Sequence, residues 1–102
     1  MSFKKVAVLG LGKVGHLAAE LLAESGFAVT GIDSREVKAP FATKVADLMN
    51  VAGLQDVLRG QEAVLSCLPY HLNKGVSTVA HALGIHYFDL TEDVPTTKHI
   101  RE

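Results

Sequence analysis

Three closely spaced glycines form the pattern in this chain that predicts chemistry most directly. The sequence Gly10-Leu11-Gly12-Lys13-Val14-Gly15 follows an apolar run and opens a segment with helical spacing. In such a turn the first glycine permits a sharp change of direction, the second lets backbone approach a pyrophosphate, and the third lets helix and strand pack closely. The N–H groups at the helix start favour an anion. A turn that serves packing alone is the less favoured alternative, because a buried strand precedes it and an amphipathic helix follows.

An acid follows the glycine turn at the spacing that a dinucleotide site requires. Asp33 comes directly after the apolar run 27–32, at the end of a second expected strand. A carboxylate there accepts hydrogen bonds from the adenosine ribose and repels a 2′-phosphate, which predicts NAD rather than NADP. Ser34 and Arg35 share this loop, and an arginine here can hold a 2′-phosphate, so NADP is the second choice. Asp33 bonding only its own loop backbone is the other alternative.

Further candidate residues lie where later strands are expected to end. Asp47 either accepts the adenine amino group or caps the helix beginning near Asn50, and the two readings are equally supported. Leu68 and Pro69 would lie against the nicotinamide ribose. We expect His71 to be an exposed or capping histidine, and no catalytic residue is assigned.

A group of polar residues lies at the end of the last expected strand and just after it: Asp89, Thr91, Glu92 and Asp93. They fall at the carboxyl end of the sheet, where ligands bind in open α/β folds. The favoured interpretation is nevertheless a solvated loop with a helix cap.

The elements that must position these residues alternate between two apolar patterns. Continuous apolar runs are typical of strands buried on both faces, and the segments between them have helical spacing, such as the stripe Val14, Leu17, Ala18, Leu21 and Leu22. We expect strands at 3–9, 27–32, 43–47, 62–68 and 85–90, helices at 13–24, 51–59 and 72–83, and a possible further helix from Pro95. This alternation predicts an α/β, Rossmann-type parallel sheet of order 3-2-1-4-5 with helices on both faces. Residues 34–42 hold Pro40 and are too few for a usual crossover helix, so an irregular connection is expected there.

Composition narrows the class of protein. The chain has 102 residues, one domain's length, and 48% of them are apolar, which argues against disorder. No apolar run approaches the roughly 20 residues of a membrane span. The net charge of −1 argues against nucleic-acid binding. The five histidines have no metal-site spacing, and the single Cys67 excludes an internal disulfide. We expect no signal peptide, a cytoplasmic location, and a parent chain longer than residues 1–102.

Several segments together resemble the N-terminal domain of the saccharopine dehydrogenase-like family, which includes saccharopine reductases, lysine 6-dehydrogenases and carboxynorspermidine dehydrogenases. The most telling are Leu68-Pro69-Tyr70 and the spacing of Gly84, Tyr87 and Asp89. The resemblance covers essentially the whole chain, in the order GLGKVG, Asp33, Ala46-Asp47-Leu48, SCLPYHLN and GIHYFDLTED.

The resemblance implies a parent oxidoreductase that transfers a hydride at a C–N bond of an amino acid, with the substrate held by a second domain and a homo-oligomer possible. The isolated domain is then expected to bind cofactor without turnover. One departure from the family pattern matters. The resemblance to NADP-type saccharopine reductases implies a Ser/Cys-Arg pair at the end of the second strand, whereas this chain has Asp33-Ser34-Arg35. The alternative functions are a non-catalytic NAD-sensing domain, as in potassium-uptake systems, and a fold that has lost its ligand.

Overall fold

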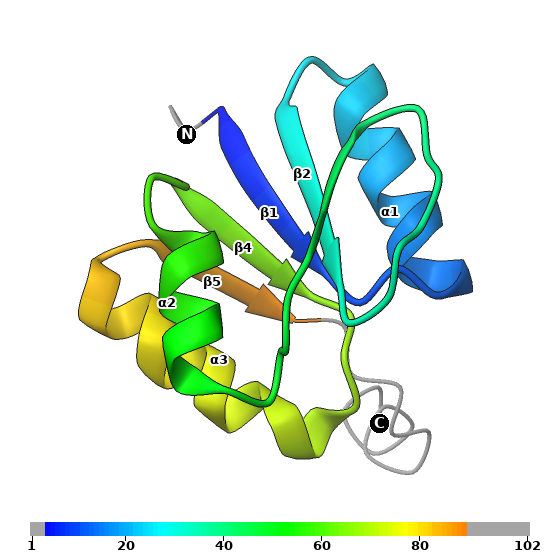
Figure 1. The fold of residues 1–102 in the computed structure, drawn as a ribbon. Helices are drawn as coiled ribbons and strands as arrows, with labels where there is room; N and C mark the ends of the chain where they lie inside the picture. The colour runs from blue at the N-terminus through cyan, green and yellow to red at the C-terminus, as the bar shows by residue number, and fades with distance from the viewer. Residues whose placement is uncertain (1–3, 90–102) are drawn as a thin grey trace, which may run out of the picture.

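A five-stranded parallel sheet organises the chain in the computed structural model, which describes residues 4–89 (Figure 1). The side chains of Tyr70 and His71 and everything from residue 90 onward, including the acids at 92 and 93 and the segment from Pro95, lie outside the described residues. The elements in chain order are β1 (Lys5–Leu9), α1 (Lys13–Glu24), β2 (Ala28–Asp33), β3 (Ala42–Val45), α2 (Val51–Leu58), β4 (Ala63–Ser66), α3 (Tyr70–Leu83) and β5 (His86–Asp89).

The strand order is β3-β2-β1-β4-β5, with every pair parallel, which confirms the predicted Rossmann-type topology. β1 lies at the centre, where Val8 pairs with Gly31 of β2 and with Leu65 of β4. The continuous apolar run of this strand is buried from Val6 to Leu9, as a strand covered on both faces requires.

Each face of the sheet carries its own hydrophobic cluster. Successive side chains of a strand point to opposite faces. Val8 therefore packs with Ala19 of α1, whereas Leu9 packs with Leu54 of α2 and Val76 of α3. Figure 1 shows α2 and α3 lying together, well apart from α1. This arrangement follows from right-handed crossovers, because the chain runs outward from β1 in one direction and returns to fill the other.

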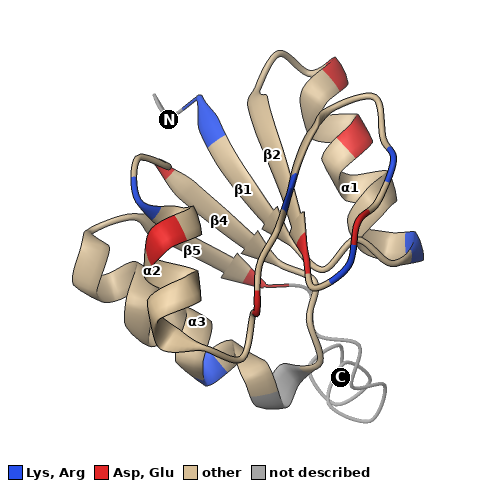
Figure 2. Ribbon diagram, viewed as in Figure 1, with Lys and Arg blue, Asp and Glu red and all other residues tan. Residues whose placement is uncertain are grey.

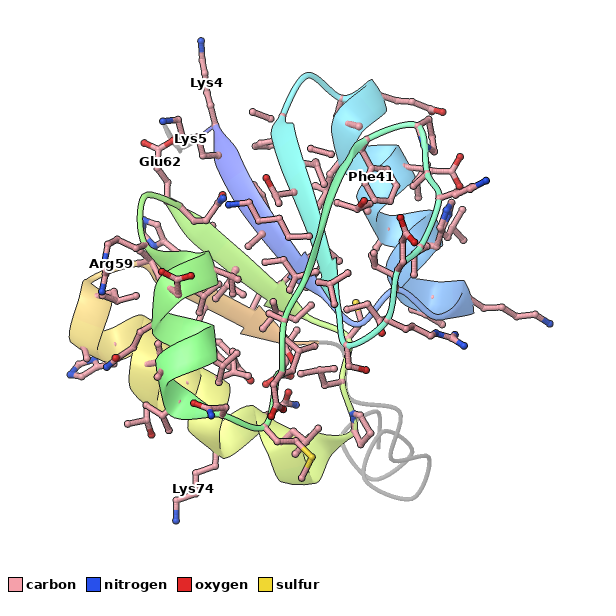
Figure 3. All side chains as sticks on the ribbon, in the orientation of Figure 1. Lys4, Lys5, Phe41, Arg59, Glu62 and Lys74 are labelled. Carbon is pink, nitrogen blue, oxygen red and sulfur yellow. The ribbon has the colours of Figure 1, made fainter. Side chains whose placement is uncertain are left out.

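The connection from β2 to β3 contains no helix, as Pro40 and its short length predicted. It is anchored by Val37 and Phe41, which pack against the cluster on the α1 side of the sheet. Figure 3 shows Phe41 between this connection and α1, where its ring lies 5.3 Å from that of His16. Two apolar side chains thus replace a crossover helix.

The apolar stripe expected on α1 describes its buried face only in part. Gly15 and Ala19 are buried, whereas Val14, Leu17 and Leu21 are 42%, 58% and 54% exposed. The reason is close packing: small residues let the helix axis approach the sheet, so these three side chains lie outward while Leu22 packs against the cluster on this side. The fully buried residues of this helix are therefore its small ones, Gly15 and Ala19.

Strands end earlier than the apolar runs suggest. β4 ends at Ser66 rather than residue 68, and β3 ends at Val45 rather than residue 47. In both cases the neighbouring strand stops: β1 ends at Leu9, which pairs with Ser66, and β2 ends at Asp33, which pairs with Val45. Helix α3 accordingly begins at residue 70, two residues before the expected start.

Candidate dinucleotide-binding site

The glycine turn joins the end of β1 to the start of α1. Gly10 adopts a φ of 87°, a left-handed conformation that favours glycine, and its N–H donates to the carbonyl of Ile32 at 2.8 Å. A Cβ on Gly15 would collide with the carbonyl oxygen of Gly10. The first and third glycines of the motif therefore build the turn itself.

The second glycine has a different environment. A Cβ built on Gly12 meets no atom within 4 Å, and the residue stands at the N-cap of α1 in extended conformation. It supplies no side chain to cap the helix, and the first turn of α1 contains no acid. The N–H groups of Lys13 and Val14 follow at this end, where the helix dipole favours an anion. The space in front of Gly12 and the helix terminus behind it fit a pyrophosphate.

Asp33 stands at the end of β2 and reaches back to the glycine turn. Its Oδ2 accepts the backbone N–H of Leu11 at 2.7 Å. Its Oδ1 has two longer contacts within residues 4–89, with the hydroxyl of Ser34 at 3.4 Å and the N–H of Arg35 at 3.3 Å. Asp33 therefore bonds both its own loop and the glycine turn, and Oδ1 is the oxygen that a ribose hydroxyl can share. The side chain of Arg35 is exposed beside it.

Asp47 does not cap α2, so that interpretation is wrong. Its Oδ1 accepts the N–H of Met49 at 3.0 Å in a short turn. Asn50 is the cap instead, with Oδ1 accepting the N–H groups of Ala52 at 2.8 Å and Gly53 at 3.3 Å. An amide oxygen one residue before the helix has the reach that the more distant carboxylate lacks. The role of Asp47 toward adenine stays a prediction.

The turn between β4 and α3 packs directly on the glycine turn. A Cβ on Gly10 would lie 2.9 Å from Leu68 Cδ2 and 3.2 Å from the Cys67 carbonyl oxygen. Pro69 is exposed and stands at the N-cap of α3. Cys67 is half-buried and lies just beyond the end of β4. The structure therefore brings Leu68 and Pro69 to the same edge of the sheet as the glycine turn.

One buried polar contact at this edge was not anticipated as such. Ser66 is fully buried, and its hydroxyl donates to Oδ1 of Asn73 at 2.6 Å. Both residues belong to the SCLPYHLN segment, where they counted only toward the family resemblance. The available signal was a serine inside an apolar strand run with an asparagine seven residues later, at the spacing of a strand–turn–helix unit.

Other kinds of site find no support in residues 4–89. Figure 2 shows acidic and basic residues interspersed over the helices, strands and connections, without one basic face. Within these residues no group of three metal-ligating side chains is brought together. None of the helices formed by this part of the chain has the length and apolar character needed to cross a membrane.

Comparison with known proteins agrees with this geometry. The family model of the saccharopine dehydrogenase NADP binding domain matches residues 6–102. The chain belongs to this family. The match confirms the resemblance and assigns the domain to NAD(P)-binding, dehydrogenase-like proteins. The choice between NAD and NADP stays a prediction.

Solved structures share the fold at low sequence identity. Saccharopine dehydrogenase (L-Glu forming) from Saccharomyces cerevisiae is similar with a TM-score of 0.77 and 22% identity, over 84% of this chain and 21% of that one. A precorrin-6A reductase is similar with a TM-score of 0.73 and 21% sequence identity, over 85% of this chain and 38% of that one. A short-chain dehydrogenase/reductase superfamily protein from Agrobacterium tumefaciens with bound NAD has a TM-score of 0.71 and 24% sequence identity, over 82% of this chain and 31% of that one. The chain thus spans less than half of the length of each of these proteins. No curated protein sequence matches it significantly.

Proposed function

We propose that this chain is the NAD-binding domain of an oxidoreductase that transfers a hydride at a C–N bond of an amino acid. The observation that carries the proposal is the open space at Gly12 in front of the uncapped start of α1, with the Asp33 carboxylate tied to the same turn at 2.7 Å. A pyrophosphate fits the first feature and an adenosine ribose fits the second.

Within this proposal each part of the cofactor has its residues. The N–H groups at Lys13 and Val14 would hold the pyrophosphate, with the exposed Lys13 ammonium adding charge. Oδ1 of Asp33 would accept ribose hydroxyls, and Asp47 would accept the adenine amino group. The turn at 67–69 would lie against the nicotinamide ribose. When bound, the nicotinamide ring supplies or accepts the hydride.

The preference for NAD rests on the charge of Asp33. A 2′-phosphate placed beside this carboxylate would bring two negative charges together at a site where Oδ2 already has its donor. Such a mismatch costs about 1–3 kcal/mol. Ser34 and Arg35 supply a hydroxyl and a guanidinium nearby, which is what supports NADP as the second choice. The description of the matching family names NADP, which also supports NADP as the second choice.

The reaction itself requires more than these residues. Hydride transfer needs the substrate carbon held against the nicotinamide with water excluded. We propose that a further domain of the parent protein holds an amino-acid substrate at the carboxyl end of the sheet, and that the 102-residue chain alone binds cofactor without turnover.

The test is a pair of measurements on the same chain. Calorimetric titration with NADH and with NADPH should give a lower Kd for NADH, and assays that follow the reduction of NAD⁺ to NADH with amino-acid substrates should give no turnover. Tighter binding of NADPH would overturn the NAD assignment. Turnover equal to that of the full-length parent under the same conditions would place the catalytic groups within this domain.

A further inference from the structure

A buried polar pair joins the end of β4 to α3 at the carboxyl end of the sheet. Ser66, at the end of β4, has no exposed surface, and Asn73, in the first turns of α3, is 8% exposed. The serine hydroxyl donates to Asn73 Oδ1 at 2.6 Å. We call these two residues the Ser66–Asn73 pair. It joins the strand to the helix across the turn at residues 67–69.

The pair is also connected to that turn. The backbone N–H of Leu68 donates to Ser66 Oγ over a long distance of 3.5 Å. On its other side Leu68 lies against Gly10, where an added Cβ would meet Leu68 Cδ2 at 2.9 Å. The turn is therefore held between a buried hydrogen bond beneath it and the glycine turn beside it.

The last strand supports the pair from its other end. The hydroxyl of Tyr87 in β5 lies 3.5 Å from the backbone carbonyl of Asn73. Burial, and then hydrogen bonding to the Asp89 carboxylate, raise the pKa of Tyr87 well above its ordinary value. The hydroxyl therefore stays protonated and able to donate. Asp89 is paired with Ser66 across β4 and β5, so all four side chains gather at one corner of the sheet.

A buried serine and asparagine give this corner of the sheet no more stability than apolar side chains would. An apolar pair of similar shape would be nearly neutral for stability, because the net gain from a buried hydrogen bond is small. What the hydrogen bond adds is a fixed distance and direction between β4 and α3. That geometry decides where the backbone of residues 67–69 lies relative to the glycine turn.

We propose that Asn73, acting through Ser66, is a positioning residue that sets the 67–69 turn for the nicotinamide half of the cofactor. The adenosine half depends instead on Asp33 and the start of α1. This inference rests on the proposed dinucleotide binding. It divides the site into two halves with separate determinants, one in the glycine turn and β2, the other in β4, α3 and β5.

The experiment compares NADH with ADP, a probe that lacks the nicotinamide half, on the 102-residue chain. Asn73→Leu should raise the Kd for NADH about ten-fold, because a displaced 67–69 turn no longer fits the nicotinamide half, and leave the Kd for ADP within about two-fold. Thr78→Ala, which removes an exposed hydroxyl bonded to the Lys74 carbonyl in the same helix, should change neither.

A double variant separates positioning from stability. Ser66→Ala combined with Asn73→Leu removes both side chains of the buried hydrogen bond, so the melting temperature should recover while the NADH-specific loss persists. If NADH affinity returns with stability, or if NADH and ADP weaken equally, the role is structural and the proposal fails. Unchanged NADH binding in both variants also overturns it. A wild-type chain that binds neither NADH nor ADP overturns the proposed function. If both ligands bind and the ratio of their Kd values is the same in the variants as in wild type, only the positioning role is overturned.

Discussion

The carboxylate of Asp33 is hydrogen-bonded to the glycine turn, because its Oδ2 accepts the N–H of Leu11 at 2.7 Å across 22 residues of sequence. This bond ties the end of β2 to the turn that follows β1. The same carboxylate thereby has two tasks, one to fix the glycine turn and one to present Oδ1 to a ligand. The two tasks can be separated by substitution.

Asp33→Asn keeps an oxygen for Leu11 and removes the charge, whereas Asp33→Ser removes both. We expect the asparagine variant to keep its melting temperature and to narrow the NADH-to-NADPH affinity gap by about 1–3 kcal/mol, since the repulsion of a 2′-phosphate is gone. The serine variant should narrow the gap similarly and also lose about 1 kcal/mol of stability. Calorimetry and thermal denaturation measure the two effects. An unaltered affinity gap in both variants would show that Asp33 does not select the cofactor.

Arg35→Ala tests the opposite preference. The side chain is exposed, and it is the cation that follows Asp33 in the loop after β2. We expect the Kd for NADH to stay within about two-fold and the Kd for NADPH to rise, because a guanidinium is the group suited to a phosphate. A rise in the NADH constant as large as that for NADPH would mean that Arg35 holds the shared pyrophosphate rather than the 2′ position.

Two glycine-to-alanine changes should have opposite effects on stability. Gly15→Ala places a methyl against the carbonyl of Gly10 and should cost about 3 kcal/mol or more. Gly75→Ala, inside α3 with no atom within 4 Å, should add about 0.5–1 kcal/mol. Urea denaturation of the two variants and wild type measures both. Equal stability of the Gly15 variant and wild type would refute the close packing of turn and helix.

Glu62 should make stability depend on acid pH. Its side chain accepts the N–H groups of Lys4 and Lys5 at 2.8 and 2.9 Å, and these bonds lower its pKa below 4.5 (Figure 3). A lowered folded-state pKa contributes stability above the unfolded value, and this contribution is lost as the pH falls through the folded one. The melting-temperature difference between wild type and Glu62→Gln should therefore be largest near neutrality and shrink below about pH 4. A difference independent of pH would contradict this.

The order of elements and the glycine turn were predictable because both depend on local pattern. Apolar runs ending in Gly-x-Gly-x-x-Gly, with an acid about 20 residues on, specify strand, turn and helix without distant contacts. Pro40 likewise excluded a long helix between β2 and β3. These features need only the chemistry of neighbouring residues.

The features that were not predicted depend on contacts between residues far apart in the sequence, or on how closely a helix packs against the sheet. The buried face of α1 is set by Gly15 and Ala19, which an apolar pattern ranks below Leu17. The ends of β3 and β4 are set by where their partners stop. The function of Asn73 depends on Ser66 lying beneath it, which requires the strand-to-helix geometry.

Calorimetric titration of NADH into wild type and Gly12→Val tests the central claim, binding at the glycine turn, most directly. The extended backbone of Gly12 and the open space around it accommodate valine, so the variant should keep the wild-type melting temperature. The valine side chain would fill the space assigned to the pyrophosphate, and the account predicts at least about ten-fold weaker NADH binding. A folded Gly12→Val variant that binds NADH as tightly as wild type would contradict it.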